Sequence, residues 1–306
     1  MRLHHRPSRE RARGVALIAV LWLIAILTLL ATTVATLSVS HRRAAQRFTE
    51  AVQLDSLADS AIRVMLLRLI APKSPNERVA VGGVQRLELF GGVVDVTVER
   101  ELGRIDINTA AEELIFALFA ANGWEDQRAR AMANRIADWK DTDDLRREGG
   151  AERDDYRTAG LEYAPRNSAF ESPEELRQVL GANEITPDLF NSITVYTHAQ
   201  SLPEALATGP VMRALALADE RQLGGHRWIV AREPLSDGSS PGLSPVAAAD
   251  GPATLIGEVV RIRSCAKRQA LERCRTSIVR LTGSASTPVQ IFAWQAAAAS
   301  VSLMER

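Results

Sequence analysis

The sequence predicts an α+β fold in which a long N-terminal helix packs on an antiparallel sheet that carries a large all-helical insertion. Three observations lead to this prediction. A helical pattern runs without a break from an apolar segment near the N-terminus to about residue 70. Alternating strands follow it and return near the C-terminus, and a helix-rich segment of about 100 residues separates the two groups of strands.

The N-terminal helix begins in residues 15–39, a run of 25 residues without a charge, a proline or a glycine. A helix of this length spans a hydrocarbon core of about 30 Å. The helical pattern then continues in amphipathic form until Pro72 and Pro75 end it. Its apolar positions are Ala51, Leu54, Ala58, Ile62, Met65 and Leu69.

The charges of the chain predict its orientation in a membrane. Lys+Arg and Asp+Glu balance at 37 each over 306 residues, so no overall positive charge attracts nucleic acid. Residues 1–13, however, carry five Arg and one Glu, and the rest of the chain is net negative. A basic leader before an apolar run keeps the N-terminus in the cytoplasm. The body after residue 40 is therefore expected in the periplasm or elsewhere outside the cytoplasm, anchored in the inner membrane by a single span.

Three interpretations of the N-terminus are open. It is an ordinary signal anchor, a secretory signal cleaved near residues 31–35, or a short basic leader of the prepilin type that ends in Gly14 just before Val15. The apolar run is long for a cleaved secretory signal. The pair Arg13-Gly14 at the boundary of the run, followed by an unbroken helix, favours the prepilin leader.

The remaining elements follow from local patterns. Two alternating strands joined by Gly91-Gly92 predict a β-hairpin. Asn108 or Thr109 is the expected N-cap of the first helix of the insertion. The predicted strands are 84–90, 93–99, 194–198, 226–231, 254–263, 276–281 and 289–294, the predicted helices are 110–121, 125–139, 172–180, 187–193 and 202–223, and an exposed loop is predicted over 234–252.

An acidic loop inside the insertion is the best candidate for a ligand site. Clusters of carboxylate oxygens suit Ca²⁺, which takes six to eight oxygen ligands. The loop is not an EF-hand, because Leu145 and Arg146 stand where a ligand and a glycine belong. The alternative is a solvated loop whose acids pair with Arg146, Arg147 and Arg153. The candidate ligands are Asp138, Asp141, Asp143, Asp144, Glu152, Asp154 and Asp155.

The two cysteines of the chain lie close together in the sequence. Cys265 and Cys274 are at the inner ends of two predicted strands, with residues 266–273 between them. In an oxidising compartment they can form a disulfide that closes this loop. The alternative is a pair of free thiols.

No pattern in the sequence predicts catalysis, and a nucleic-acid function has one weak signal. The five histidines are scattered, and there is no nucleophile triad, zinc-protease or nucleotide-binding motif, so we do not expect an enzyme. Residues 105–110 resemble the start of a helix-hairpin-helix DNA-binding module. The turns at 121–124 and 181–184, however, offer a single glycine each, and the acidic loop would repel a duplex. An envelope-anchored DNA-binding protein is the alternative function.

Taken in order, several segments resemble the K-type minor pseudopilins of the type II secretion system, the general secretion pathway protein K family. The C-terminal 100 residues match that family only in their strand pattern. The segments that carry the resemblance are RGVAL at 13–17, IDINTA at 105–110, ADWKDTDD at 137–144, GAE at 150–152, Tyr156, SPEELRQVL at 172–180 and ITVYT at 193–197.

This resemblance implies a pilin-like helix and sheet with a large helical insertion, and a place at the tip of the periplasmic pseudopilus. It implies partners among the H-, I- and J-type minor pseudopilins and the major pseudopilin, removal of residues 1–14 by prepilin peptidase, and N-methylation of Val15. Family members are associated with calcium in the helical domain. The implied divisions are a leader at 1–14, a transmembrane half-helix at 15–40, the pilin helix and first strands at 41–102, the helical insertion at 103–200, and the return to the sheet at 201–306.

One position departs from the pilin pattern. Most pilin-like subunits carry Glu at the fifth residue after the cleavage point, and this chain has Ala19 there. A carboxylate inside a bilayer is costly unless it is matched by an opposite charge. In those families it is understood to be matched by the N-terminal amine of the neighbouring subunit. Ala19 therefore favours a subunit that enters the assembly first and never docks beneath an earlier one.

Overall fold

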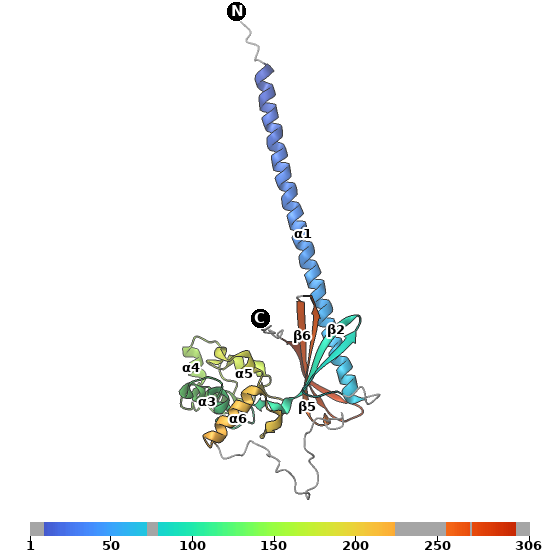
Figure 1. The fold of residues 1–306 in the computed structure, drawn as a ribbon. Helices are drawn as coiled ribbons and strands as arrows, with labels where there is room; N and C mark the ends of the chain where they lie inside the picture. The colour runs from blue at the N-terminus through green and yellow to red at the C-terminus, as the bar shows by residue number, and fades with distance from the viewer. Residues whose placement is uncertain (1–8, 72–78, 224–254, 270, 298–306) are drawn as a thin grey trace, which may run out of the picture. The chain divides into compact units, whose positions relative to one another are not determined.

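The computed structural model describes residues 9–71, 79–223, 255–269 and 271–297. It divides into two compact units, Met1–Ser56 and Leu57–Arg306. Helix α1 (Arg9–Ile70) is one continuous helix, as predicted, and it ends two residues before Pro72 (Figure 1). Within the described part of the chain, no helix combines the length and the apolar composition that crossing a membrane requires.

The last turns of α1 contribute to the core of the second unit. Ala58, Ile62, Met65 and Leu69 are at most 3% exposed, at the amphipathic positions that the sequence predicts. Asp59, on the same part of the helix, accepts a hydrogen bond from Trp294 Nε1 at 2.8 Å. The apolar stripe and this polar contact together hold the end of α1 on the sheet.

The main sheet is antiparallel and has five strands in the order β1-β2-β5-β6-β7. Its inward positions on β2 are fully buried valines, which alternate with polar residues. The predicted α+β class and the first hairpin are confirmed. The strands are β1 (Val84–Leu89), β2 (Gly92–Arg100), β5 (Val259–Arg268), β6 (Leu271–Leu281) and β7 (Val289–Ala297).

The C-terminal hairpin is longer than the sequence predicts. The expected strands stop before the cysteines, whereas β5 and β6 run through Cys265 and Cys274. These two residues lie directly opposite each other in the register, and Gln269 in the turn has a φ of 53°. The expectation of an eight-residue loop between the cysteines is therefore wrong, because the cross-strand pairing continues up to a tight turn.

The insertion leaves the sheet after β2 and returns at β5. Figure 1 shows its helices α3, α4, α5 and α6 gathered in one block. Helix α6 contributes four buried residues to the same core as α2, although the sequence analysis grouped this stretch with the return to the sheet. The α-helices and short strands are β3 (Ile105–Asp106), α2 (Glu112–Ala120), α3 (Asp126–Lys140), α4 (Arg153–Thr158), α5 (Pro187–Phe190), β4 (Ile193–Thr194) and α6 (Gly209–Glu220).

Three local predictions in the insertion are corrected. The residue before α2 is Ala111, because Asn108 instead exchanges hydrogen bonds of 2.8 and 2.9 Å with the main chain of Phe170. The predicted helix at 172–180 is a 3₁₀-helix, Pro173–Gln178. Of the predicted strand at 194–198, only Thr194 is paired, as part of β4 (Ile193–Thr194). The N–H groups of Thr197 and His198 instead donate to the carboxylate of Asp106.

Some sequence predictions lie outside the described residues. These are the structure of residues 1–8 of the leader, the strand at 226–231 and the loop at 234–252. Gly14 and Val15 fall inside α1, where the backbone but not the side chains is described.

Candidate functional site

Asp106 joins the first residues of the insertion to residues 194–198, and we call this junction the neck of the insertion. It is 3% exposed, and its Oδ2 accepts hydrogen bonds from Thr197 N at 3.1 Å and His198 N at 2.8 Å. Its strand β3 pairs in parallel with β4, so the two ends of the helical block are tied together. Lys140, the last residue of α3, donates to the carbonyl of Ile107 at 2.7 Å and thereby links the neck to the start of the acidic loop.

An aromatic cluster supports the acidic loop from inside the insertion. Trp139 is 2% exposed and stacks on Phe170, with ring centroids 6.1 Å apart. Tyr156 and Tyr163 contact its other sides at 5.8 and 6.5 Å. Because Trp139 lies between Asp138 and Lys140, this packing fixes the end of α3, where the acidic loop begins.

Asp138 anchors the return of the loop. It is fully buried, and its Oδ2 accepts a hydrogen bond from Ala151 N at 2.9 Å. Its Oδ1 accepts a second bond from Arg147 Nη1, also at 2.9 Å. A Cβ on Gly150 would lie 1.9 Å from Asp138 Oδ2, so glycine is required at this close approach. Asp138 therefore holds the two ends of the loop together.

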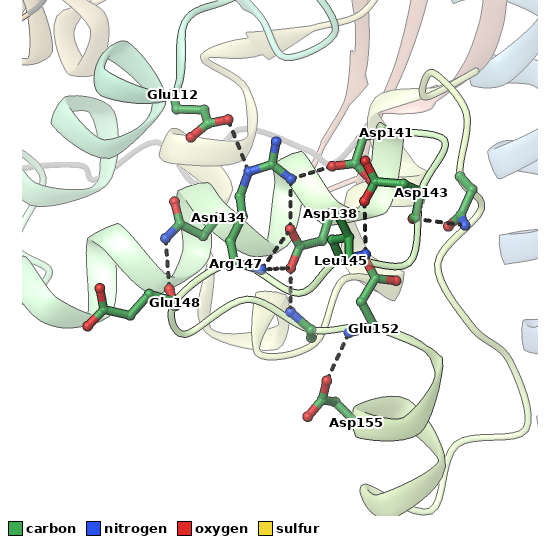
Figure 2. A network of polar contacts seen from close by, with 12 residues as sticks. Glu112, Asn134, Asp138, Asp141, Asp143, Leu145, Arg147, Glu148, Glu152 and Asp155 are labelled. Atoms are coloured by element: carbon green, nitrogen blue, oxygen red, sulfur yellow. Dashed lines mark hydrogen bonds and ion pairs between the residues drawn. The ribbon is translucent and has the colours of Figure 1, made fainter.

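Arg147 is the main cation of the loop. Its guanidinium contacts Asp138 and Asp141, and its Nε lies 3.3 Å from Glu112 Oε1 on α2 (Figure 2). Hydrogen bonds to Asp141 and Asp138 raise the pKa of Arg147 further above its ordinary value. One guanidinium thus neutralises part of a larger group of acids.

Several buried oxygens of the loop have no hydrogen-bond donor. Among the described residues these are both carboxylate oxygens of Glu152, Oδ1 of Asp141 and Oδ1 of Asn167. Glu152 is only 6% exposed. Its burial, and then the charges of Asp138 and Asp141, raise the pKa of Glu152 to about 7. Buried acceptors without a hydrogen-bond donor lower the stability of a folded protein and are therefore rare. Several of them in one loop suggest a place for a positively charged group.

The structure brings together five of the seven acids that the sequence singles out, and we name these five the acidic cluster: Asp138, Asp141, Asp143, Asp144 and Glu152. The negative charges of the other four raise the pKa of Glu152. Asp143 also caps the loop, because its Oδ1 accepts a hydrogen bond from Leu145 N at 2.8 Å. Asn167 donates to Asp144 Oδ1 at 3.2 Å and so joins the far end of the cluster.

Asp154 and Asp155 do not belong to the cluster. The Asp154 side chain is 80% exposed and pairs with Arg157. Asp155 accepts hydrogen bonds from Glu152 N and from Arg146, which makes it a cap at the start of α4. For Asp155 the alternative interpretation, a loop acid paired with Arg146, describes the structure, whereas Asp154 pairs with Arg157, which that interpretation did not name.

Sequence reasoning missed Asn167 and Glu112 as members of this region. Asn167 has a φ of 54°, a conformation that asparagine tolerates better than most residues, but nothing in the sequence places it beside the loop. Glu112 looked like an ordinary acid in the first turn of a helix. It instead lies beside Arg147, 35 residues later in the chain.

The donor set fits a hard cation. The unsatisfied atoms are carboxylate and amide oxygens, which are calcium ligands, with no nitrogen or sulfur among them. The oxygens of the acidic cluster lie farther apart than the ligands of a fully formed metal site. Among the described residues, the group of three potential ligands whose atoms lie within 4.8 Å of one another is Cys265, Glu272 and Cys274. A disulfide already joins the two sulfurs of that group.

A second buried acid forms the junction between the sheet and the insertion. Glu101 is fully buried and accepts two hydrogen bonds from Arg261 of β5, at 2.7 and 2.9 Å. Arg104 also contacts Glu101, and its Nε donates to the carbonyl of Asn191 in the insertion at 2.8 Å. Although burial raises it, the pKa of Glu101 is lowered overall by the charges of Arg261 and Arg104.

The comparisons with known proteins agree with this fold. Residues 97–198, which include the neck and the acidic cluster, match the family model described as type II secretion system (T2SS), protein K. This segment is therefore similar to the protein K domain of type II secretion systems. The resemblance to K-type minor pseudopilins is thereby confirmed.

One solved structure is similar along most of the chain. It is the crystal structure of the GspK-GspI-GspJ complex from the type 2 secretion system of enterotoxigenic Escherichia coli. The match has 16% identity and a TM-score of 0.53, and it covers 85% of this chain and 100% of that chain, which shows a shared fold. No curated protein sequence matches. The domain and the fold together support a minor pseudopilin of type II secretion.

Proposed function

We propose that the chain is a minor pseudopilin that stands at the tip of the type II secretion pseudopilus and initiates its assembly. The observation that carries this proposal is the protein K domain, inserted between β2 and β5 of a sheet that packs on the end of one long helix. Helices of this kind associate side by side in a filament. The helical block, in contrast, is an addition that extends from Ile105 to Glu220, and regularly stacked subunits would have to accommodate it.

The N-terminal half of α1 is proposed as the inner-membrane anchor, with the body in the periplasm. The uncharged run at 15–39 supports this, as do exposed large apolar side chains such as Trp22 (66%) and Leu29 (65%). Prepilin peptidase would cleave after Gly14, and Val15 would become the methylated N-terminus. Replacing Gly14 with Leu should leave the full-length form in the membrane.

The proposed partners are the I- and J-type minor pseudopilins, with the H-type and major pseudopilins in the assembled filament. The similar crystal structure is that of a GspK-GspI-GspJ complex. We expect the purified chain to retain I- and J-type proteins when the three are co-expressed. Binding to a DNA duplex at physiological salt without pseudopilin association would favour the alternative function and overturn this proposal.

Ala19 supports the place at the tip. Its side chain is exposed on α1 and cannot offer the carboxylate that most pilin-like subunits place at this position. We expect Ala19→Glu to bring no gain in assembly or secretion when it is the only copy in the cell. Incorporation of this variant along the length of the pseudopilus would contradict a tip-only subunit.

We further propose that the acidic cluster holds Ca²⁺. Glu152 and Asp141, with the amide oxygen of Asn167, would supply ligands, because their buried oxygens have no donor. When bound, the ion would neutralise acids that otherwise repel one another at the end of α3. Asp138 would keep its structural role, since both of its oxygens already accept hydrogen bonds.

Thermal unfolding tests the calcium proposal. A ligand that binds only the folded state stabilises it by about 2.7 kcal/mol when its concentration is 100 times the dissociation constant. Chelation should therefore lower the melting temperature of the purified chain. Asp141→Ala combined with Asp143→Ala should remove the response to chelator. A melting temperature of the unmodified protein that does not change when calcium is added or removed would refute the site.

A further inference from the structure

Arg147 links three acids that come from different parts of the insertion. Its Nη1 lies 2.9 Å from Asp138 Oδ1 and also contacts Asp141 Oδ2, and its Nε lies 3.3 Å from Glu112 Oε1. Asp138 lies in the last turn of α3, Asp141 follows that helix, and Glu112 begins α2. The side chain is 35% exposed, so it can move without unpacking the core.

The same guanidinium leaves much of the acidic cluster unneutralised. Asp141 uses one oxygen for Arg147, while its other oxygen and both oxygens of the buried Glu152 have no donor among the described residues. A planar guanidinium directs its N–H groups within one plane, so it cannot surround the cluster as an ion with six to eight ligands does. Arg147 therefore satisfies Asp138 and Asp141 only in part.

A bound cation and this position of Arg147 are in conflict. A calcium ion on Asp141 and Glu152 would lie a few ångströms from the guanidinium, where two positive charges repel. Glu112 already contacts the Nε of Arg147, and its side chain is 39% exposed. It thus offers a nearby acceptor onto which the guanidinium can shift while the backbone N–H of Arg147 stays close to Asp138.

We propose that Arg147 is a built-in competitor of the cation: it holds Asp138 and Asp141 in the cation-free loop, and it shifts to Glu112 when the ion binds. This inference rests on the calcium proposal above. It explains how the loop stays ordered around clustered carboxylates before an ion arrives. It also sets the affinity for calcium below the value that the carboxylates alone would give.

Calcium titration of Arg147→Gln in the full chain tests this role. We expect the variant to bind calcium about tenfold more tightly than the unmodified protein, since coupled sites commonly differ by 5–150-fold. Its calcium-free melting temperature should fall, because the loop loses its counter-ion. Arg147→Lys, which keeps the charge but loses the planar fork, should give a smaller gain and provides a second variant should Arg147→Gln fail to fold.

Two further variants make the test specific. Arg146→Gln is the matched control, because it removes the same charge one residue away, where the partner is Asp155 outside the cluster. Its calcium affinity should change much less. Glu112→Gln should weaken calcium binding, because the displaced guanidinium loses its acceptor.

The outcomes separate this inference from the calcium proposal. Unmodified protein that binds no calcium overturns both. Calcium binding by the unmodified protein, with equal or weaker binding by Arg147→Gln and Arg147→Lys, overturns the competitor role alone. An equal gain in Arg146→Gln would show that net charge, and not the contact with Asp138 and Asp141, sets the affinity, which also overturns it.

Discussion

Two buried glutamates of the same chain have opposite surroundings. Glu101 is fully buried at the junction of sheet and insertion, and Arg261 and Arg104 satisfy it. Glu152 is 6% exposed in the acidic loop, and neither of its oxygens accepts a hydrogen bond from a described residue. The pKa of Glu101 is lowered by its arginines despite its burial, whereas burial and neighbouring acids raise the pKa of Glu152 to about 7.

This difference separates a structural acid from a candidate ligand. A buried carboxylate with its charge and hydrogen bonds satisfied needs nothing from outside the protein. A buried carboxylate beside other acids keeps its proton up to a higher pH, and a positive charge placed beside it would favour the ionised form. The comparison thus identifies Glu101 as part of the scaffold and Glu152 as the acid that the proposed ion would satisfy.

The largest expected effect comes from breaking the satisfied pair. Glu101→Gln should lower the free energy of unfolding by about 3–5 kcal/mol, because it leaves the buried Arg261 without its charge partner. Urea denaturation measures this loss. Glu99→Gln is the control, since Glu99 is 45% exposed and contacts the same Arg104. Its loss should stay below about 1 kcal/mol, and equal losses would contradict the role given to burial.

A smaller effect should appear in the pH dependence of the calcium-free protein. With a folded-state pKa of about 7 against an ordinary 4.5, Glu152 binds a proton in the folded state that the unfolded chain has released. Stability should therefore fall as pH rises from 4.5 to 7, by up to about 1.4 kcal/mol per pH unit.

The variant Glu152→Gln isolates this contribution. It should flatten the dependence between pH 4.5 and 7 and should stabilise the calcium-free protein at pH 8. Denaturant midpoints measured across the pH range report both changes. An unchanged slope in the variant would mean that other groups cause the dependence, and the contrast with Glu101 would be lost.

The smallest effect marks the boundary of the acidic cluster. Asp154 is 80% exposed and pairs with Arg157, which is 75% exposed. Asp154→Asn should change stability by less than about 0.5 kcal/mol. It should also leave the response to calcium intact, unlike Asp141→Asn. A calcium response that disappears in Asp154→Asn would place this acid inside the site.

The sequence predicted the features of the molecule that depend on local patterns. Helix α1 and the first hairpin follow from periodicity and from Gly91-Gly92, and the acidic loop follows from composition. The cap at Asn108 and the strand at 194–198 were wrong, because Phe170 and Asp106 take those polar groups from positions far along the chain.

The division of the acidic loop could not be predicted for the same reason. The seven candidate acids fall within 18 residues of the sequence, and only packing decides their surroundings. Trp139 buries the end of α3 and carries Asp138 inward, while the start of α4 directs Asp154 to solvent. The contacts of Arg147 with Asp138 and Asp141, and of Asn167 with Asp144, likewise depend on tertiary packing.

A crystal structure determined in the presence of calcium, with an anomalous difference map, tests the central claim most directly. The account predicts an anomalous peak bound by Glu152 and Asp141, with Glu101 still on Arg261. A map without a peak at the acidic cluster, in crystals that contain saturating calcium, would contradict it.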